Sequence, residues 1–291
     1  MKHILITGAG GQLGSSLREA GRKHDQYTFA YLDIQDLDLT DALRVRHYFS
    51  SARFDYVINC AAFTAVDLAE KQADQAFSVN AGVPALLGKI CLEHSVFLLH
   101  LSTDYVYSGV IGQPHTEEEN PVALSVYAKS KLQGELSLRD NSRAIVIRTS
   151  WLYSEYGNNF LKTMLRLSKE RSELGIVFDQ TGTPTYAGDL ADALLSIISF
   201  SERQGFRPGT YNYANEGVCS WYDFAVEIMQ LAGRNCTIKP IRTAEYPLPA
   251  KRPAYSVMDK IKIKNTFGIE IMHWKQSLKT AIKNLKETNL F

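Results

Sequence analysis

A glycine-rich turn between an apolar strand and a helix is the feature that most constrains how this chain folds. The turn Gly8-Ala9-Gly10-Gly11-Gln12-Leu13-Gly14 directly follows the apolar run Lys2–Thr7 and opens an amphipathic stretch. Glycines spaced in this way allow a tight turn, a close approach of backbone to a pyrophosphate, and close packing of helix on strand. Such turns also occur as purely structural loops, but this one lies where a dinucleotide would meet the positive end of a helix. The sequence therefore predicts a dinucleotide site that includes Gly8, Gly11 and Gly14.

Short apolar runs alternate with longer amphipathic stretches through the first half of the chain. Strands are predicted at Lys2–Thr7, Thr28–Leu32, Tyr56–Cys60, Phe97–Leu101 and Ala144–Arg148, and helices at Leu13–His24, Asp41–Ser50, Asp74–Glu93 and Val126–Leu138. Several of these strands are apolar throughout, as strands buried on both faces are. Right-handed crossovers then give an α/β fold, a Rossmann-type doubly wound parallel sheet that binds ligands at the carboxyl ends of its strands.

From about residue 151 the alternation is less regular, which indicates a smaller C-terminal unit. Helices are predicted at Asn159–Arg171, Asp189–Phe200, Trp221–Leu231, Lys260–Phe267 and Lys275–Lys286, with a strand at Gly209–Tyr213. We expect a nucleotide-binding domain at 1–150, rejoined by about 189–214, and a mainly substrate-binding lobe at 151–291.

Composition and length exclude several classes of protein. A chain of 291 residues buries enough surface to fold without stabilising disulfides or metal ions, and it is too long for a peptide scaffold. Lysine and arginine total 32 against 31 acidic residues, so no strong field attracts nucleic acid or an acidic membrane. No apolar run approaches the roughly 18 residues of a membrane span, and we expect no secretory leader, because Met1 runs directly into an apolar strand. We expect a cytoplasmic protein with neither a nucleic-acid nor a membrane partner.

The cysteines and histidines lack the spacing of metal sites. The four cysteines, at positions 60, 91, 219 and 236, lie far apart, which favours free thiols in a reducing compartment. His94, His100 and His115 form no His-x-x-x-His pair, so no protein-built metal site is predicted. The run Glu117-Glu118-Glu119 is interpreted as a solvated loop.

Asp33 ends the second predicted strand, about 20 residues after the glycines, where a carboxylate accepts from a ribose 2′-hydroxyl. It favours NADH, because a carboxylate repels the 2′-phosphate of NADPH. Arg44 or Arg46 could instead bind that phosphate, so the choice between the two cofactors stays open. Asp38 and Leu39 follow a short extended piece and are expected to meet the adenine.

Tyr127 and Lys131 stand one helical turn apart, so their side chains share a helix face. A neighbouring ammonium favours the phenolate of a tyrosine, whose free pKa is about 10. The fourth strand runs into Ser102-Thr103, which places hydroxyls at the ligand-binding edge of the sheet. An ordinary surface helix and a turn-capping threonine are the alternatives. Occurring together after the glycine turn, these residues favour catalysis, with Thr103 holding a carbonyl oxygen and Tyr127 donating a proton.

With these motifs the sequence resembles the extended short-chain dehydrogenase/reductases, and within them the dTDP-4-dehydrorhamnose reductase family. Apart from the glycine turn, the matching segments are Asn59–Glu70 (NCAAFTAVDLAE), Leu101–Tyr107 (LSTDYVY), Tyr127–Glu135 (YAKSKLQGE), Arg148–Tyr153 (RTSWLY), Gly157–Phe160 (GNNF), Asp179–Thr185 (DQTGTPT) and Arg252-Pro253. They span most of the chain. Ala128, Cys60 and Tyr255 depart from the residues common in the family.

The resemblance implies a set of site residues for NADPH or NADH and for a nucleotide sugar. Gly11, Gln12 and Leu13 would meet the pyrophosphate, Ala62, Phe63 and Thr64 the nicotinamide side, and Thr103, Tyr127 and Lys131 would form the catalytic trio. Thr103, Asp104, Tyr105, Trp151 and Asn159 would face the deoxysugar, and Arg252 the nucleotide diphosphate.

The activity implied is NAD(P)H-dependent reduction of the 4-keto group of dTDP-4-dehydrorhamnose. A nucleotide-sugar epimerase or dehydratase shares the turn and the trio, although Asp104 lacks the acidic neighbour that dehydratases use. A non-catalytic NAD(P)-binding regulatory subunit, like the β subunit of methionine adenosyltransferase, is the alternative from another class. The sequence leaves a homodimer and bound magnesium open.

Overall fold

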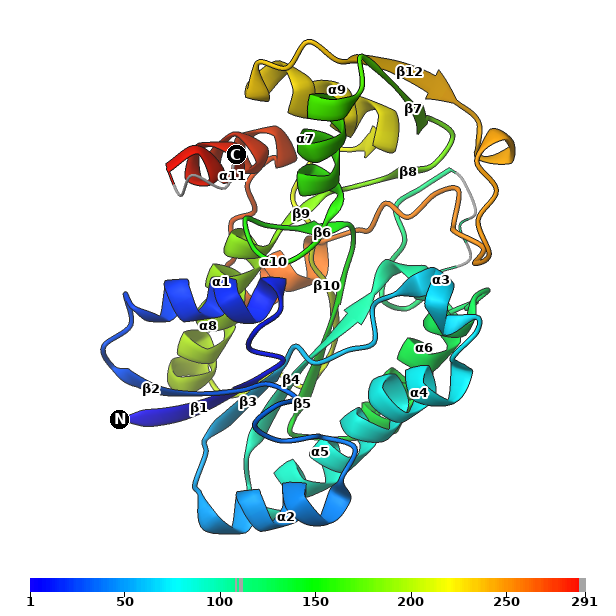
Figure 1. Cartoon of the computed structure of the whole chain (residues 1–291). Helices are drawn as coiled ribbons and strands as arrows, with labels where there is room; N and C mark the ends of the chain where they lie inside the picture. The colour runs from blue at the N-terminus through cyan, green and yellow to red at the C-terminus, as the bar shows by residue number, and fades with distance from the viewer. Residues whose placement is uncertain (108, 110–111, 288–291) are drawn as a thin grey trace.

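A six-stranded parallel sheet organises the first part of the computed structural model, which describes residues 1–107, 109 and 112–287. The strand order is β10-β5-β4-β3-β1-β2 (Figure 1). The strands are β1 (Lys2–Thr7), β2 (Tyr27–Leu32), β3 (Tyr56–Asn59), β4 (Phe97–Thr103), β5 (Ala144–Thr149) and β10 (Gly209–Asn212). All five neighbouring pairs are parallel, so the predicted Rossmann-type sheet is confirmed.

Helices cover both faces of this sheet (Figure 1). One face carries α1 (Gln12–Gly21), α8 (Ala187–Gln204) and α10 (Ile261–Phe267); the other carries α2 (Ala42–Ser51), α5 (Val83–Glu93) and α6 (Val126–Leu138), with α3 (Val66–Ala69) and α4 (Ala73–Phe77) nearby. Successive strand residues point to opposite faces. In β1, Ile4 and Ile6 therefore pack under α1 and α8, whereas Leu5 packs under α2 and α5. This is why the strands are apolar throughout.

A second hydrophobic core lies beyond the carboxyl ends of the strands, at the top of Figure 1. It is built by α7 (Phe160–Glu170), α9 (Trp221–Ala232), α11 (Trp274–Glu287) and the strand pair β7 (Glu173–Val177) and β12 (Thr237–Ile241). The shorter elements are the strand pairs β6 (Leu152–Tyr153) with β9 (Thr185–Tyr186) and β8 (Thr181–Gly182) with β11 (Cys219–Ser220), and the 3-10 turns η2 (Asp104–Val106) and η3 (Thr243–Glu245). Residues 187–212 return to the first part and supply α8 and β10 to it. The expected domain boundary at residue 150 stays a prediction.

The single helix predicted at Asp74–Glu93 is interrupted, which corrects the sequence interpretation. A π-helical turn, η1 (Ser78–Gly82), separates α4 from α5. Within it Asn80 is fully buried, and its side chain accepts from the Phe63 N–H at 2.8 Å and donates to the Phe63 carbonyl at 3.0 Å. Its amide also donates to the Ser130 hydroxyl on α6 at 3.0 Å. Extra residues in such turns redirect side chains, and here the turn fixes the 61–64 loop.

A buried ion pair joins the sheet to α6. The Arg148 guanidinium on β5 meets the Glu135 carboxylate at 2.7 Å, and each side chain is only 5% exposed. Arg148 also donates to the Tyr107 hydroxyl at 3.0 Å, and Tyr107 donates to Asn212 of β10 at 2.7 Å. The network therefore connects β5, β10 and the helix that carries Tyr127.

No helix in the part of the chain that the structure describes is long and apolar enough to cross a bilayer. All four cysteines carry free thiols.

We expect Glu135→Ala to destabilise the protein by about 3–5 kcal/mol, because it leaves the Arg148 charge buried without its partner. Urea unfolding measures this loss. The matched control is Glu170→Ala, which removes the partner of Arg166 in a pair whose side chains are 62% and 57% exposed. That change should alter stability by less than about 1 kcal/mol. Equal effects of the two substitutions would contradict the structural importance of the buried pair.

Candidate active site

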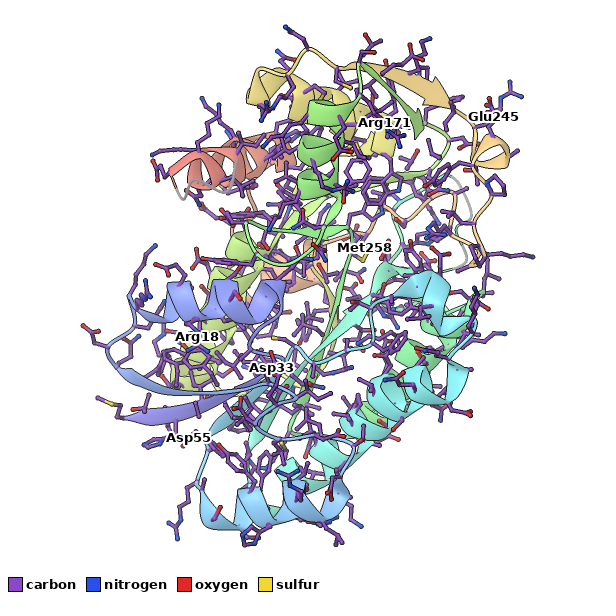
Figure 2. The ribbon with its side chains drawn as sticks, viewed as in Figure 1. Arg18, Asp33, Asp55, Arg171, Glu245 and Met258 are labelled. Carbon is purple, nitrogen blue, oxygen red and sulfur yellow. The ribbon has the colours of Figure 1, made fainter. Side chains whose placement is uncertain are left out.

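A cleft of about 850 Å³ opens at the carboxyl ends of the parallel strands. Its volume falls within the range of small-molecule and cofactor sites. Every site residue predicted from the sequence lines it except Arg252. Asp33, labelled in Figure 2, lies where β2 reaches this edge.

The glycine turn fits tightly between β1, β3 and α1. Gly8 has a φ of +63°, and a Cβ there would lie 2.7 Å from the Ala61 nitrogen. A Cβ at Gly14 would lie 2.5 Å from the Gly8 carbonyl oxygen. Gly11 is the N-cap of α1, and no side chain caps the first turn of that helix. Its N–H groups are therefore available to an anionic group such as a pyrophosphate.

Asp33 ties the end of β2 to this turn, since its carboxylate accepts from the Gly10 N–H at 2.6 Å. The side chain is half-buried at the cleft wall.

Asp38 accepts from both the N–H and the hydroxyl of Thr40, and these hydrogen bonds lower the pKa of Asp38. The Asp38 carboxylate is therefore hydrogen-bonded within its own loop. Asp38 and Leu39 both line the cleft.

The trio Thr103, Tyr127 and Lys131 converges where β4 meets α6. The helix begins at Ser125, whose hydroxyl accepts from the Ala128 N–H at 3.1 Å, and this cap sets the register of Tyr127. The Lys131 ammonium donates to the Leu101 carbonyl of β4 at 2.6 Å. The phenol of Tyr127 faces the Thr103 hydroxyl.

Burial dominates the protonation of this pair. It raises the pKa of Tyr127 to about 12, against the opposing effect of Thr103. It lowers the pKa of Lys131 to about 8, against the opposing effects of Glu135 and Cys60. Lys131 is not among the causes of this shift, because its amine is turned to the Leu101 carbonyl, so a lowering of the Tyr127 pKa by Lys131 stays a prediction. The protonated phenol at neutral pH is the form that a proton donor requires.

Asp104 is a buried carboxyl beside the trio, with 2% of its surface exposed. Its Oδ1 accepts from the Thr103 hydroxyl at 3.1 Å, and the Thr103 oxygen accepts from the Tyr105 N–H at 3.2 Å. Burial raises the pKa of Asp104 to about 7, while Ser256, Thr103 and His115 oppose the rise. A carboxyl that titrates near neutrality in a cleft is typical of functional sites.

Trp151 reaches the cleft in a strained backbone conformation, with a φ of +47°. Its ring stacks on Trp221 of α9, with centroids 3.6 Å apart and planes 11° apart. Gly182 also lies close to the ring, because a Cβ there would lie 2.8 Å from the indole. These contacts explain the glycine of the Asp179–Thr185 segment and hold the indole in place.

Asn159 and Arg252 are engaged in protein contacts. The Asn159 amide caps α7 and donates to the Gln12 side chain at 2.9 Å, which joins the glycine turn to the C-terminal core. Arg252 makes a two-pronged ion pair with Asp67, at 2.7 and 3.2 Å. Arg252 therefore lies outside the cleft lining, although its charge still acts on the neighbouring Tyr105.

Sequence reasoning missed Asn80, Asp67 and Trp221. The signal for Asn80 was the Gly82 and Pro84 pair inside a predicted helix. Asp67 and Trp221 act through partners 185 and 70 positions away, and only the fold brings these together. Among the described residues no group of histidine, cysteine and acidic side chains is arranged to hold a metal ion.

Three known proteins are similar to this chain over nearly its whole length. The chain is 42% identical to a dTDP-4-dehydrorhamnose reductase of Aggregatibacter actinomycetemcomitans, over 96% of this chain and 98% of that protein. A crystal structure of a dTDP-4-dehydrorhamnose reductase from Clostridium acetobutylicum superimposes with a TM-score of 0.93 at 42% identity, covering 98% and 99% of the two chains. The Bacillus anthracis reductase, solved in complex with NADP, gives a TM-score of 0.93 at 35% identity and covers 98% and 100%.

The doubly wound sheet, the glycine turn and the trio define an extended short-chain dehydrogenase/reductase. A family model described as RmlD substrate binding domain matches residues 1–287, and the chain belongs to that family.

We expect Asp104→Asn to change how stability depends on pH. A carboxyl whose pKa rises on folding keeps its proton longer in the folded state, so the wild type loses stability as pH rises from about 4 to about 7. Each unit of the rise corresponds to about 1.4 kcal/mol. Asparagine does not titrate, so the variant should gain stability relative to the wild type across this window. Urea unfolding at several pH values measures the difference, and a constant difference would contradict the prediction.

Proposed function

We propose that this protein reduces the 4-keto group of dTDP-4-dehydrorhamnose with NADPH or NADH to give dTDP-L-rhamnose. The observation that carries the proposal is the convergence of Thr103, Tyr127 and Lys131 beside a glycine turn whose helix start is uncapped. Relatives that match nearly the whole chain are named dTDP-4-dehydrorhamnose reductases, which agrees with this chemistry.

The cofactor supplies a hydride to the keto carbon when bound. The N–H groups that follow Gly11 would hold its pyrophosphate, and the loop that Asn80 anchors through Phe63 would lie along its nicotinamide side. Both segments line the same cleft. The absence of room for a Cβ at Gly8 and Gly14 fits a backbone that must come close to the pyrophosphate.

The chain's own residues then manage the oxygen and its proton. Thr103 holds the carbonyl oxygen, and Tyr127 donates its phenolic proton to the oxygen as negative charge develops there. The fixed position of Lys131 on Leu101 keeps an ammonium one helical turn from the phenol. That charge stabilises the phenolate left after proton donation and is available to a ribose hydroxyl.

On the substrate side we propose that Trp151, Asp104 and Tyr105 contact the deoxysugar, since all three line the cleft next to Thr103. Asn159 contributes through the Gln12 contact it maintains, and Arg252 serves the nucleotide diphosphate after leaving Asp67. We also propose that the enzyme is cytoplasmic and has no nucleic-acid partner. The free cysteines fit a reducing compartment, and the net charge of +1 offers no strong attraction to nucleic acid. Whether it forms a homodimer is a matter for sedimentation analysis.

Tyr127→Phe should lower kcat by about 10²–10⁴-fold, because phenylalanine cannot donate the proton. The assay is loss of absorbance at 340 nm with dTDP-4-dehydrorhamnose and each reduced cofactor. Cofactor binding should persist, since the substitution removes one oxygen. Tyr246→Phe is the matched control, because Tyr246 is 55% exposed and does not line the cleft. Wild-type turnover by Tyr127→Phe would refute the mechanism, and an inactive wild type that binds cofactor would favour a regulatory role.

Asp33→Ala should raise kcat/KM for NADPH relative to NADH by at least about tenfold, because removing a carboxylate near the ribose removes repulsion of the 2′-phosphate. The matched control is Asp25→Ala. It removes the same charge just before the amino end of β2, away from the edge of the sheet that carries the cleft. Steady-state kinetics with both cofactors for both variants measures the ratio. An unchanged ratio in Asp33→Ala would place the ribose elsewhere.

A further inference from the structure

The lining of the cleft carries little positive charge for a substrate that contains a diphosphate. Among the described residues that line the cleft, Lys131 is the only basic one, and its ammonium donates to the Leu101 carbonyl at 2.6 Å. Three carboxyl groups, those of Asp33, Asp38 and Asp104, line the same cleft. Phosphate groups bind best to charged donors, above all to the fork of an arginine. A cation for the diphosphate must therefore come from the rim of the cleft.

Arg252 is tied to both sides of this rim, although it does not line the cleft itself. Its guanidinium meets Asp67 of α3, and the residue before Asp67 lines the cleft. Two positions after Arg252, the Ala254 carbonyl accepts from the Thr181 N–H at 2.8 Å. Thr181 belongs to β8, whose glycine lies against the Trp151 indole. The segment that carries Arg252 therefore runs between the α3 side and the Trp151 side of the cleft.

The Asp67 carboxylate occupies the whole fork of Arg252. One guanidinium nitrogen lies 2.7 Å from Asp67 Oδ2, and the other lies 3.2 Å from Oδ1. Two parallel N–H···O bonds of this kind are also the geometry in which arginine holds a phosphate. The guanidinium keeps the pKa of Asp67 below its ordinary value, so the carboxyl is ionised. Asp67 thus presents to Arg252 what a phosphate group would present.

We propose that Asp67 is a stand-in for the diphosphate of the nucleotide sugar, and that substrate binding exchanges one anion for the other on Arg252. This inference rests on the nucleotide-sugar substrate proposed above. Asp67 then weakens substrate binding, because the fork is free in only a fraction of the molecules and that fraction reduces the apparent affinity. In the empty protein Asp67 gives the guanidinium a partner that is already at hand.

The exchange is local, because the contacts around the pair remain when the guanidinium leaves. The Ala250 N–H donates to Asp67 Oδ1 at 3.1 Å, so the carboxylate keeps a donor. The Arg252 and Asp67 side chains are 18% and 36% exposed, and ion pairs that water reaches contribute little to stability. The backbone beyond Arg252 is held on β8 by the Thr181 N–H and by the Ser256 N–H, which donates to the Thr181 carbonyl at 2.8 Å. Only the Arg252 side chain has to move.

The experiment is calorimetric titration of the full-length protein with dTDP, without cofactor. Asp67→Asn should lower the Kd of dTDP by at least about threefold, because the fork no longer has a charged competitor. Asparagine keeps an oxygen that accepts from the Ala250 N–H, so the segment stays in place. Thymidine lacks the diphosphate, so it should bind the variant and the wild type equally well.

Two further variants separate competition for Arg252 from a general effect of charge. Glu70→Gln removes the same charge three positions away and keeps an acceptor for the Val126 N–H, which lies 2.9 Å from Glu70. It should leave the Kd of dTDP unchanged within about 1.5-fold. Arg252→Gln should raise that Kd by about tenfold, because a charge-assisted bond to the diphosphate is lost. In this background Asp67→Asn should produce no gain, since the two groups act through one contact.

The outcomes distinguish the exchange from the function on which it rests. Unchanged or weaker dTDP binding by Asp67→Asn would overturn the exchange, and weaker binding would show that Asp67 orients Arg252 for its ligand. A gain that persists without Arg252, or that Glu70→Gln reproduces, would overturn it as well. If the folded wild type and every variant fail to bind dTDP, the nucleotide-sugar substrate is wrong, and the exchange falls with it.

Discussion

Parallel register is the constraint on which the rest of this structure depends. Thr7 pairs with Asn59, and Asn59 with His100, so β1, β3 and β4 reach the same edge of the sheet together. Because parallel strands all run in one direction, the segments that follow them must meet at that edge. The glycine turn, the 61–64 loop and Thr103 therefore share one cleft without any direct bond among them. Helix α6 is added to this frame through the Lys131 contact with β4.

Local patterns were sufficient for most of the fold and for the lining of the cleft. The helix predicted at Val126–Leu138 has those bounds because its first turn is capped by the Ser125 hydroxyl, a signal that lies within a few residues. The helix predicted at Asp74–Glu93 was interrupted because Asn80 bonds to Phe63, a partner that the local period does not contain. Arg252 shows the same limit, since its carboxylate partner is 185 positions away.

The protonation of the site could not be predicted from spacing. A tyrosine four positions before a lysine indicates a lowered phenol pKa, yet the depth of burial and the direction of the amine decide the outcome. These depend on how far α6 sinks onto the sheet, which the Glu135–Arg148 pair and the small residue Ala128 determine together. Charge buried for structural reasons thus sets the electrostatics in which the chemistry takes place.

The stacked indoles of Trp151 and Trp221 give this protein an optical property of its own. Trp151 follows the sheet strand β5, whereas Trp221 is the first residue of α9 in the C-terminal core. Two nearly parallel rings 3.6 Å apart couple their electronic transitions, and that coupling changes steeply with separation and angle. Both indoles pack against the C-terminal core, so the ultraviolet circular dichroism of the native protein is a label-free ruler of how closely the segment after β5 is held to that core.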